Sequence, residues 1–171
     1  MRKRLFIRRL LLKRDDWEAL INRVGFARLS AMPGLCGVWS VKDAIAQIAV
    51  HEQYLADRLD EIAHGETYTP AQSPAQLGRF LSHFGYPDIG SPLLSETYTD
   101  NWAVEKFRGV PIDEVVEQEI NAFCDIVNSL EAVSNEQMLQ HHLYQRVASH
   151  TYGHYREYAR AIEHWMAQVK S

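Results

Sequence analysis

The sequence predicts an all-α protein: a four-helix bundle with a long crossover between its second and third long helices. Four long segments repeat apolar residues at steps of three and four, which is typical of helices that bury one face. Almost nothing alternates with period two, as half-buried strands would. Between the second and third long segments, residues 65–110 are rich in Pro, Gly, Ser and Thr. Four amphipathic helices with one long crossover match a known bundle architecture.

The length and composition indicate one folded domain spanning residues 1–171. Apolar residues make up 46% and charged residues 23%, which excludes a mainly disordered chain. The net charge of −4 leaves no basic surface for nucleic acid, so we expect none as a partner. Two cysteines are too few for a disulfide framework. We expect Cys36 to be an unreactive loop residue and Cys124 to lie in the core.

The first helix is expected over residues 3–26, ending near Gly25. Arg8 and Arg9 interrupt its apolar stretch, which excludes a secretory signal, and we expect a cytoplasmic protein. A basic helix on a membrane surface is the alternative, but the segment continues into apolar residues at helical spacing, so we expect no membrane partner. Its buried side would carry Phe6, Leu10, Trp17, Leu20, Ile21 and Val24.

The second helix is predicted to begin at Ser40 and to end at Gly65. Ser40 followed by Asp43 forms a capping box in which Asp43 replaces the usual Glu or Gln, and glycine suits a helix end. The predicted buried stripe contains Val41, Ile45, Ile48, Leu55, Leu59 and Ile62. In the crossover that follows, short helices are expected over residues 75–84 and 99–107, because a loop of this length rarely lacks structure of its own.

The third helix is predicted from Pro111, which is tolerated in a first helical turn. Ser134 with Gln137 predicts another capping box and a short helix. The last long helix is expected over residues 141–169, with Leu143, Val147, Ile162 and Trp165 on its buried side. The buried face predicted for the third helix comprises Ile112, Val116, Ile120, Phe123, Val127 and Leu130.

His150 and His154 are the first candidates for a functional site. On a continuous helix, residues four apart project from the same face and can converge on one metal ion. The spacing alone is weak evidence for a metal site. The chain has eight histidines, and a packed or solvated pair would have the same spacing. Their alignment with Leu143, Val147 and Ile162 indicates that the pair faces the interior.

Three polar residues on the second helix complete the candidate site. Glu52 lies near the centre of the apolar stripe, where a carboxylate is costly unless it is paired or neutral. Glu52 is therefore a candidate acid or base, or a hydrogen-bond partner for a histidine. The alternative is a carboxylate at the helix edge that is exposed to solvent. His51 lies at the edge of the stripe, and Gln47 lies one turn before it.

Two motifs resemble the DinB-like family of helical bundles. They are the segment from Trp39 to Glu52 and the segment from His150 to Tyr158, which is followed by Trp165. Their order and spacing, with Asn101-Trp102 and residues 108–111 in the crossover, extend the resemblance over nearly the whole chain. Within the family, the second motif is most similar to the branch that contains small self-protection proteins. These proteins are thought to act on reactive metabolites.

The resemblance implies a divalent metal ion, zinc or nickel, bound by one histidine of the second helix and by the H-x-x-x-H pair. His150 and His154 match that pair, but the second-helix position of the family falls at Gln47, and Gln is a poor zinc ligand. His51, one turn further along, would replace it only if the ion shifted by roughly 5–6 Å.

Two functions follow as expectations. The first is a metal-dependent thiol transferase or hydrolase acting on a small reactive metabolite, with His51, His150 and His154 as ligands and Gln47 or Glu52 nearby. The second is a small-molecule-binding or structural bundle that has lost the metal site, with its histidines satisfied by Glu52 and tyrosine hydroxyls. We expect a homodimer formed through exposed helical faces.

Overall fold

A computed structural model describes residues 2–30 and 39–169, and in these ranges the regular structure is helical, without strands. The all-α prediction is therefore confirmed. The elements in chain order are α1 (Arg2–Val24), the 3-10 turn η1 (Phe26–Arg28), α2 (Val41–Ala63), α3 (Pro74–Phe84), α4 (Glu96–Phe107), α5 (Ile112–Ala132), α6 (Asn135–Gln140), α7 (Leu143–His150) and α8 (Tyr152–Val169).

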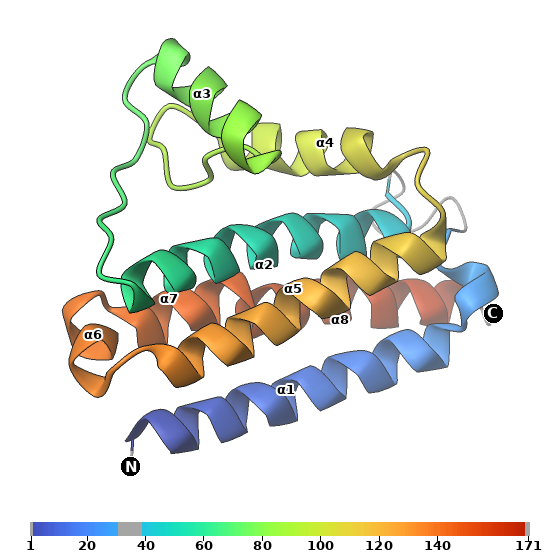
Figure 1. Cartoon of the computed structure of the whole chain (residues 1–171). Coiled ribbons are helices and arrows are strands. Elements are labelled where there is room, and N and C mark those ends of the chain that lie inside the picture. Colours follow the sequence, from blue (N-terminus) through green and yellow to red (C-terminus); the bar gives the residue numbers. More distant parts are fainter. Residues whose placement is uncertain (1, 31–38, 170–171) are drawn as a thin grey trace.

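Helix α2 lies in the middle of the molecule (Figure 1). It packs against α5, α4 and α7, whereas α1 packs mainly against α8. The short helices α3 and α4 lie on the side of α2 opposite to α1. As a result α2 is buried on nearly every side, and all six residues of its predicted stripe are buried.

The predicted helix starts are confirmed in detail. Ser40 Oγ accepts a hydrogen bond from the Asp43 amide at 3.2 Å, and Asp43 Oδ2 accepts one from the Ser40 amide at 2.9 Å. Ser134 and Gln137 form the same reciprocal pair at the start of α6. These bonds satisfy backbone donors that the first turn of a helix leaves without partners.

The core consists of two clusters of buried side chains. One gathers around Trp17, Leu20 and Ile45, and the other around Leu10, Leu59 and Ile126. No helix within residues 2–30 and 39–169 is long and apolar enough to cross a membrane.

The prediction of one last helix over residues 141–169 was wrong. His142 adopts a left-handed conformation (φ 53°) before α7, and Thr151, with φ −121° and ψ −101°, separates α7 from α8. The buried Thr151 hydroxyl donates to the Val147 carbonyl at 2.6 Å, which satisfies a carbonyl that the interrupted helix leaves free.

Two expectations about buried residues were also wrong. On α5, Phe123 and Leu130 are buried as predicted, but the rest of the buried face is displaced by about one residue to Val115, Glu119 and Ile126, and Ile120 is exposed. Cys124 is exposed as well, because it lies on the outer side of the same helix. Cys36 lies outside the described residues.

Candidate functional site

Three imidazoles meet between α2 and the α7–α8 break. His51 comes from the middle of α2, His150 is the last residue of α7, and His154 lies in the first turn of α8. The ring centroids of His51 and His154 are 4.3 Å apart, and those of His51 and His150 are 5.4 Å apart. The structure thus brings all three predicted histidines into one cluster, with His51 in contact with both others.

The break at Thr151 shapes this cluster. Because His150 ends one helix and His154 begins the next, the pair does not stand on a regular helical face as the spacing predicted. Gly153 lies at the break, where an added Cβ atom would come within 3.0 Å of the Ala148 carbonyl oxygen. The close approach of α7 and α8 therefore depends on a residue without a side chain.

A cavity of about 220 Å³ opens beside the histidines. Its apolar wall comes from Ile89 and Leu94 of the crossover, and its polar wall includes Glu96 and Thr99. The full lining is His51, Ile89, Leu94, Ser95, Glu96, Thr99, Ser149, His150 and His154. The crossover thus supplies one side of the cavity and the histidines the other.

The three imidazoles are held in their neutral form. Burial lowers the pKa of His51 well below its usual value, and the neighbouring His154 and His150 lower it further. Burial, then His154 and Arg146, lowers the pKa of His150 to about 4. Burial also lowers the pKa of His154, although Glu157 and Glu96 oppose this. Neutral rings have the free lone pairs that metal ions require.

The ring nitrogens have few partners in the protein. Nδ1 of His51 lies 3.2 Å from Nδ1 of His150, within hydrogen-bonding distance, and the buried Nδ1 of His154 has no hydrogen-bond partner among the described residues. Two nitrogens bound to one tetrahedral zinc ion at ~2.0–2.1 Å would lie about 3.3 Å apart. The observed separation therefore suits a shared proton and also two ligands of one ion.

As these side chains stand, no group of three or more His, Cys, Asp or Glu residues in the described ranges is arranged to hold a metal ion. An ion would require the rings to turn toward a common point. His154 carries the unpartnered nitrogen that such a rotation would use.

Gln47 lies one turn before His51 and is directed to a different partner. Its side-chain oxygen accepts a hydrogen bond from the Tyr158 hydroxyl, and its buried Nε2 has no partner among the described residues. Gln47 is only 1% exposed. The α2 residue that contacts both His150 and His154 is thus His51.

Glu52 points away from the histidines into a separate buried network. Its Oε1 accepts a hydrogen bond from the Tyr155 hydroxyl at 2.6 Å and lies 3.6 Å from Nη1 of Arg14. Arg14 in turn donates two hydrogen bonds to Glu119. Glu52 is therefore placed among Arg14, Glu119 and Tyr155, rather than beside the histidines as the sequence had suggested.

This network joins α1, α2, α5 and α8, and the sequence analysis did not identify it. The sequence does contain a pattern that could have identified Arg14. Arg14 lies on the buried face of α1, at helical spacing from Leu10 and Trp17. Glu119 lies on the displaced buried face of α5 and would have been found with the correct register of that helix.

Comparison of the chain with models of known protein families, with curated proteins and with solved structures finds no match.

Proposed function

We propose that this protein is a DinB-like four-helix bundle that binds one divalent metal ion through His51, His150 and His154. The observation that carries the proposal is the convergence of three neutral imidazoles from α2, α7 and α8 beside a cavity of about 220 Å³. The two DinB-like motifs contain these histidines. Helices α1, α2 and α5, together with α7 and α8, would form the four members of the bundle.

The donor set suits zinc or nickel, because imidazole nitrogen is a preferred ligand of both ions. His51 takes the place of the family histidine that falls at Gln47, whose oxygen is occupied by Tyr158. Three protein ligands leave a coordination position open, as in catalytic zinc sites.

A divalent ion held there would supply Lewis acidity and would lower the pKa of a water molecule or of a substrate thiol. Residues that line the cavity would bind the substrate. Ile89 and Leu94 would contact an apolar portion of the substrate, and Thr99 and Ser149 offer hydroxyl groups. The proposed reaction is thiol transfer or hydrolysis on a small reactive metabolite.

Asp100 does not line the cavity, but its neighbour Thr99 and the nearby Glu96 do, and we propose Asp100 as a proton carrier. It follows Thr99 on α4, and burial raises its pKa to about 6, with Glu96 and Glu157 adding to the effect. A carboxyl group with this pKa exchanges its proton close to neutral pH, which general acid or base catalysis requires.

A metal-free binding protein is the second candidate. It is favoured by the 3.2 Å contact between His51 and His150, in which one ring satisfies the other without an ion. In that case the cavity would bind a small molecule without transforming it.

Metal analysis of protein purified without an affinity tag distinguishes the metal-binding function from the metal-free one. We expect about one equivalent of zinc or nickel per chain, and a rise in melting temperature when metal is added to chelator-treated protein, since a ligand that binds only the folded state stabilises it. His154→Ala should abolish both effects.

His164→Ala provides the matched control, because it removes an exposed imidazole from the same helix. Metal content should be unchanged in this variant. If wild-type protein contains no stoichiometric metal and gains no stability from it, the metal proposal is wrong and the metal-free candidate is favoured. If Gln47→Ala lost the metal while His51→Ala kept it, the assignment of His51 would be wrong.

A further inference from the structure

The outer side of the first half of α1 carries three exposed leucines. This helix lies at the edge of the molecule opposite to α3 and α4 (Figure 1), and it packs inward through Leu10. On the other side of the helix, Leu5 is 59% exposed, Leu12 is 57% exposed and Leu11 is 41% exposed. Single exposed leucines are common, but a group of them on one stretch of helix marks an interaction surface.

Arginines border these leucines. At ~100° per residue, Leu5 and Leu12 lie ~20° apart around the helix axis, and Arg8 and Arg9 lie about 50° to either side of them. Every member of the group is exposed, and residues 2–14 contain no Asp or Glu. We call this group the α1 basic surface, and its members are Arg2, Arg4, Leu5, Arg8, Arg9, Leu11 and Leu12.

The arginines of the α1 basic surface keep their charge available. Arg4 and Arg8 form no ion pair or hydrogen bond with another residue of ranges 2–30 and 39–169. The guanidinium of Arg9 lies 5.8 Å from the centre of the Tyr152 ring, and this contact orients the cation without neutralising it. A local excess of positive charge therefore stands on a chain whose net charge is −4.

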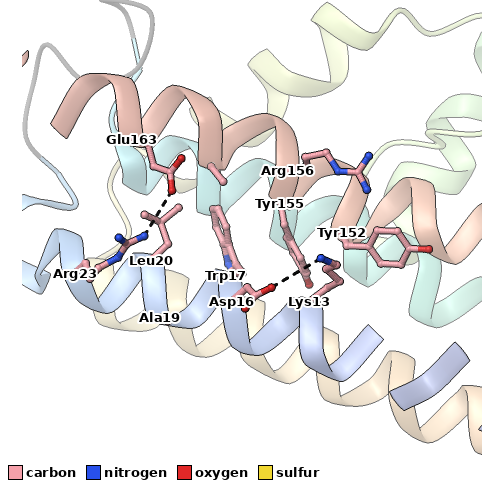
Figure 2. A pocket seen from close by; sticks show the side chains of 11 residues that line it. Lys13, Asp16, Trp17, Ala19, Leu20, Arg23, Tyr152, Tyr155, Arg156 and Glu163 are labelled. Carbon is pink, nitrogen blue, oxygen red and sulfur yellow. Dashed lines mark ion pairs between the residues drawn. The ribbon is translucent and has the colours of Figure 1, made fainter. Parts of the chain in front are cut away.

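This excess is confined to the first half of the helix. From Lys13 onward, α1 also carries acidic residues. Lys13 pairs with Asp16 at 3.9 Å, and further along Arg23 pairs with Glu163 of α8 at 3.6 Å (Figure 2). Exposed pairs of opposite charge largely cancel each other's field. The uncompensated cations and the exposed leucines thus occupy the same part of α1.

The combination of cations and leucines discriminates between partners. A second copy of the chain is disfavoured, because a symmetric contact would place arginines against arginines. Nucleic acid would pair with the arginines through its phosphates but would leave the leucines in water. An anionic membrane surface uses both, because its headgroups attract cations and the boundary below them accepts apolar side chains.

We propose that the α1 basic surface binds the surface of an anionic membrane, with its arginines at lipid phosphate groups and Leu5 and Leu12 below the headgroups. This proposal departs from the expectation of no membrane partner. On sequence alone, a bundle helix and a membrane-surface helix are alternatives for this segment. The two roles are compatible in the folded chain, because the bundle uses only the inner side of α1. The proposal does not depend on the metal site, whose residues lie on other helices.

The test measures the partition of the whole chain between buffer and sedimented vesicles of equal parts phosphatidylglycerol and phosphatidylcholine. A chelator is present, so that no metal ion at the histidines can bridge to lipid. We expect saturable binding to these vesicles and at least about tenfold weaker binding to pure phosphatidylcholine. Binding should also weaken as the salt concentration rises, because salt screens exposed charges.

A pair of double variants tests the arginines. Arg4→Gln/Arg8→Gln should weaken binding to the anionic vesicles by about tenfold or more, since each basic residue near such a surface contributes about fivefold. Arg79→Gln/Arg108→Gln is the matched control, because it removes two exposed arginines from α3 and from the end of α4. It should change the binding by less than about twofold.

A pair of single variants tests the leucines. Leu12→Ser should weaken binding to the anionic vesicles by at least about threefold, because serine gains little from leaving water. Leu93→Ser is the matched control, since Leu93 is 49% exposed but belongs to the crossover. It should leave the binding unchanged. Melting curves followed by circular dichroism establish that each variant is folded.

The proposal is overturned if wild-type protein does not sediment with the anionic vesicles, if it binds pure phosphatidylcholine equally well, or if the two arginine variants have equal effects. It is also overturned if Arg4→Gln/Arg8→Gln weakens binding while Leu12→Ser does not. The surface would then bind polyanions without entering a bilayer, and titration with duplex DNA would identify that case.

Discussion

Arg14 carries a positive charge into the middle of the helical core. Burial acts against that charge, but the hydrogen bonds and the attraction of Glu119 outweigh it and raise the pKa of Arg14 above its usual value. Burial raises the pKa of Glu52 well above its usual value, and the nearby Glu119 raises it further. Oε2 of Glu52 has no hydrogen-bond partner among the described residues. We infer that Glu52 is protonated, so that Glu119 is the buried carboxylate that pairs with Arg14, whose other partner is the half-exposed Glu18.

The two glutamates should therefore respond differently to the same substitution. Glu119→Gln removes the buried counterion of Arg14 and leaves only the half-exposed Glu18 to pair with it, so it should cost about 3 kcal/mol of unfolding free energy. Glu52→Gln should cost less than about 1 kcal/mol, because the amide is neutral like the protonated carboxyl group and its oxygen can still accept from Tyr155. Urea unfolding at pH 7 measures both. Equal losses would show that Glu52 is charged.

Among the elements, the break between α7 and α8 does most to shape the histidine site. The segments on either side of the break both have apolar residues at helical spacing. Residues 143–169 contain no proline, so the sequence does not predict an interruption there. The break depends on the Thr151 hydroxyl bond to Val147 and on the contact of Gly153 with the Ala148 carbonyl. A continuous helix through this region would place His150 and His154 on one regular face.

Gly153→Ala tests the packing at this break. Within an ordinary helix, replacing Gly with Ala stabilises by roughly 0.5–1 kcal/mol. At position 153 the new Cβ would lie 3.0 Å from a backbone oxygen, so we expect a loss of about 1 kcal/mol or more.

Gly78→Ala is the matched control, because Gly78 is an exposed residue within α3 and no atom lies within 4 Å of its added Cβ. This variant should be more stable than wild type in thermal or urea unfolding. A gain in stability at both positions would contradict the close approach at the break.

At the scale of the whole molecule, the crossover lines one side of the histidine cavity, and one buried carboxylate ties two of its segments together. Asp88 is fully buried and accepts hydrogen bonds from the Tyr68 hydroxyl and from the Ala71 amide. The Tyr54 hydroxyl donates to Tyr68 at 3.0 Å, and the Tyr54 ring lies against His150. The anchor thus connects the crossover loop, which carries Ile89, to the side of the site.

Asp88→Ala should loosen the crossover itself, because both groups that donate to Asp88 belong to it. The buried Ala71 amide and the Tyr68 hydroxyl would lose their partner, at about 1–3 kcal/mol for each group. Amide hydrogen exchange of residues 66–94 should accelerate by about tenfold or more, while the amides of α2 and α5 change less.

Asp88→Asn is the control, because its amide can accept from Ala71 and donate to Tyr68. It should preserve most of the protection. Uniformly faster exchange throughout the chain in Asp88→Ala would mean that the crossover does not open as a separate unit.

The sequence by itself determined the helices and their starts. Ser40 with Asp43, and Ser134 with Gln137, act through bonds between residues three apart, so their effect can be read locally. The buried stripes of α1 and α2 follow from periodicity in the same way, and so do the positions of α3 and α4 in the crossover.

Only the tertiary structure decided which of these residues meet. His51 contacts residues about 100 positions away, and Arg14 contacts Glu119 across 105 positions. Such pairings depend on how helices are rotated and offset against one another, and the displaced face of α5 shows that periodicity leaves this rotation uncertain by about one residue. The break at Thr151 is different, because it involves local contacts of Thr151 with Val147 and of Gly153 with Ala148 that the helical periodicity did not reveal. The chain thus specifies its helices through local hydrogen bonds and its candidate sites through contacts between distant residues.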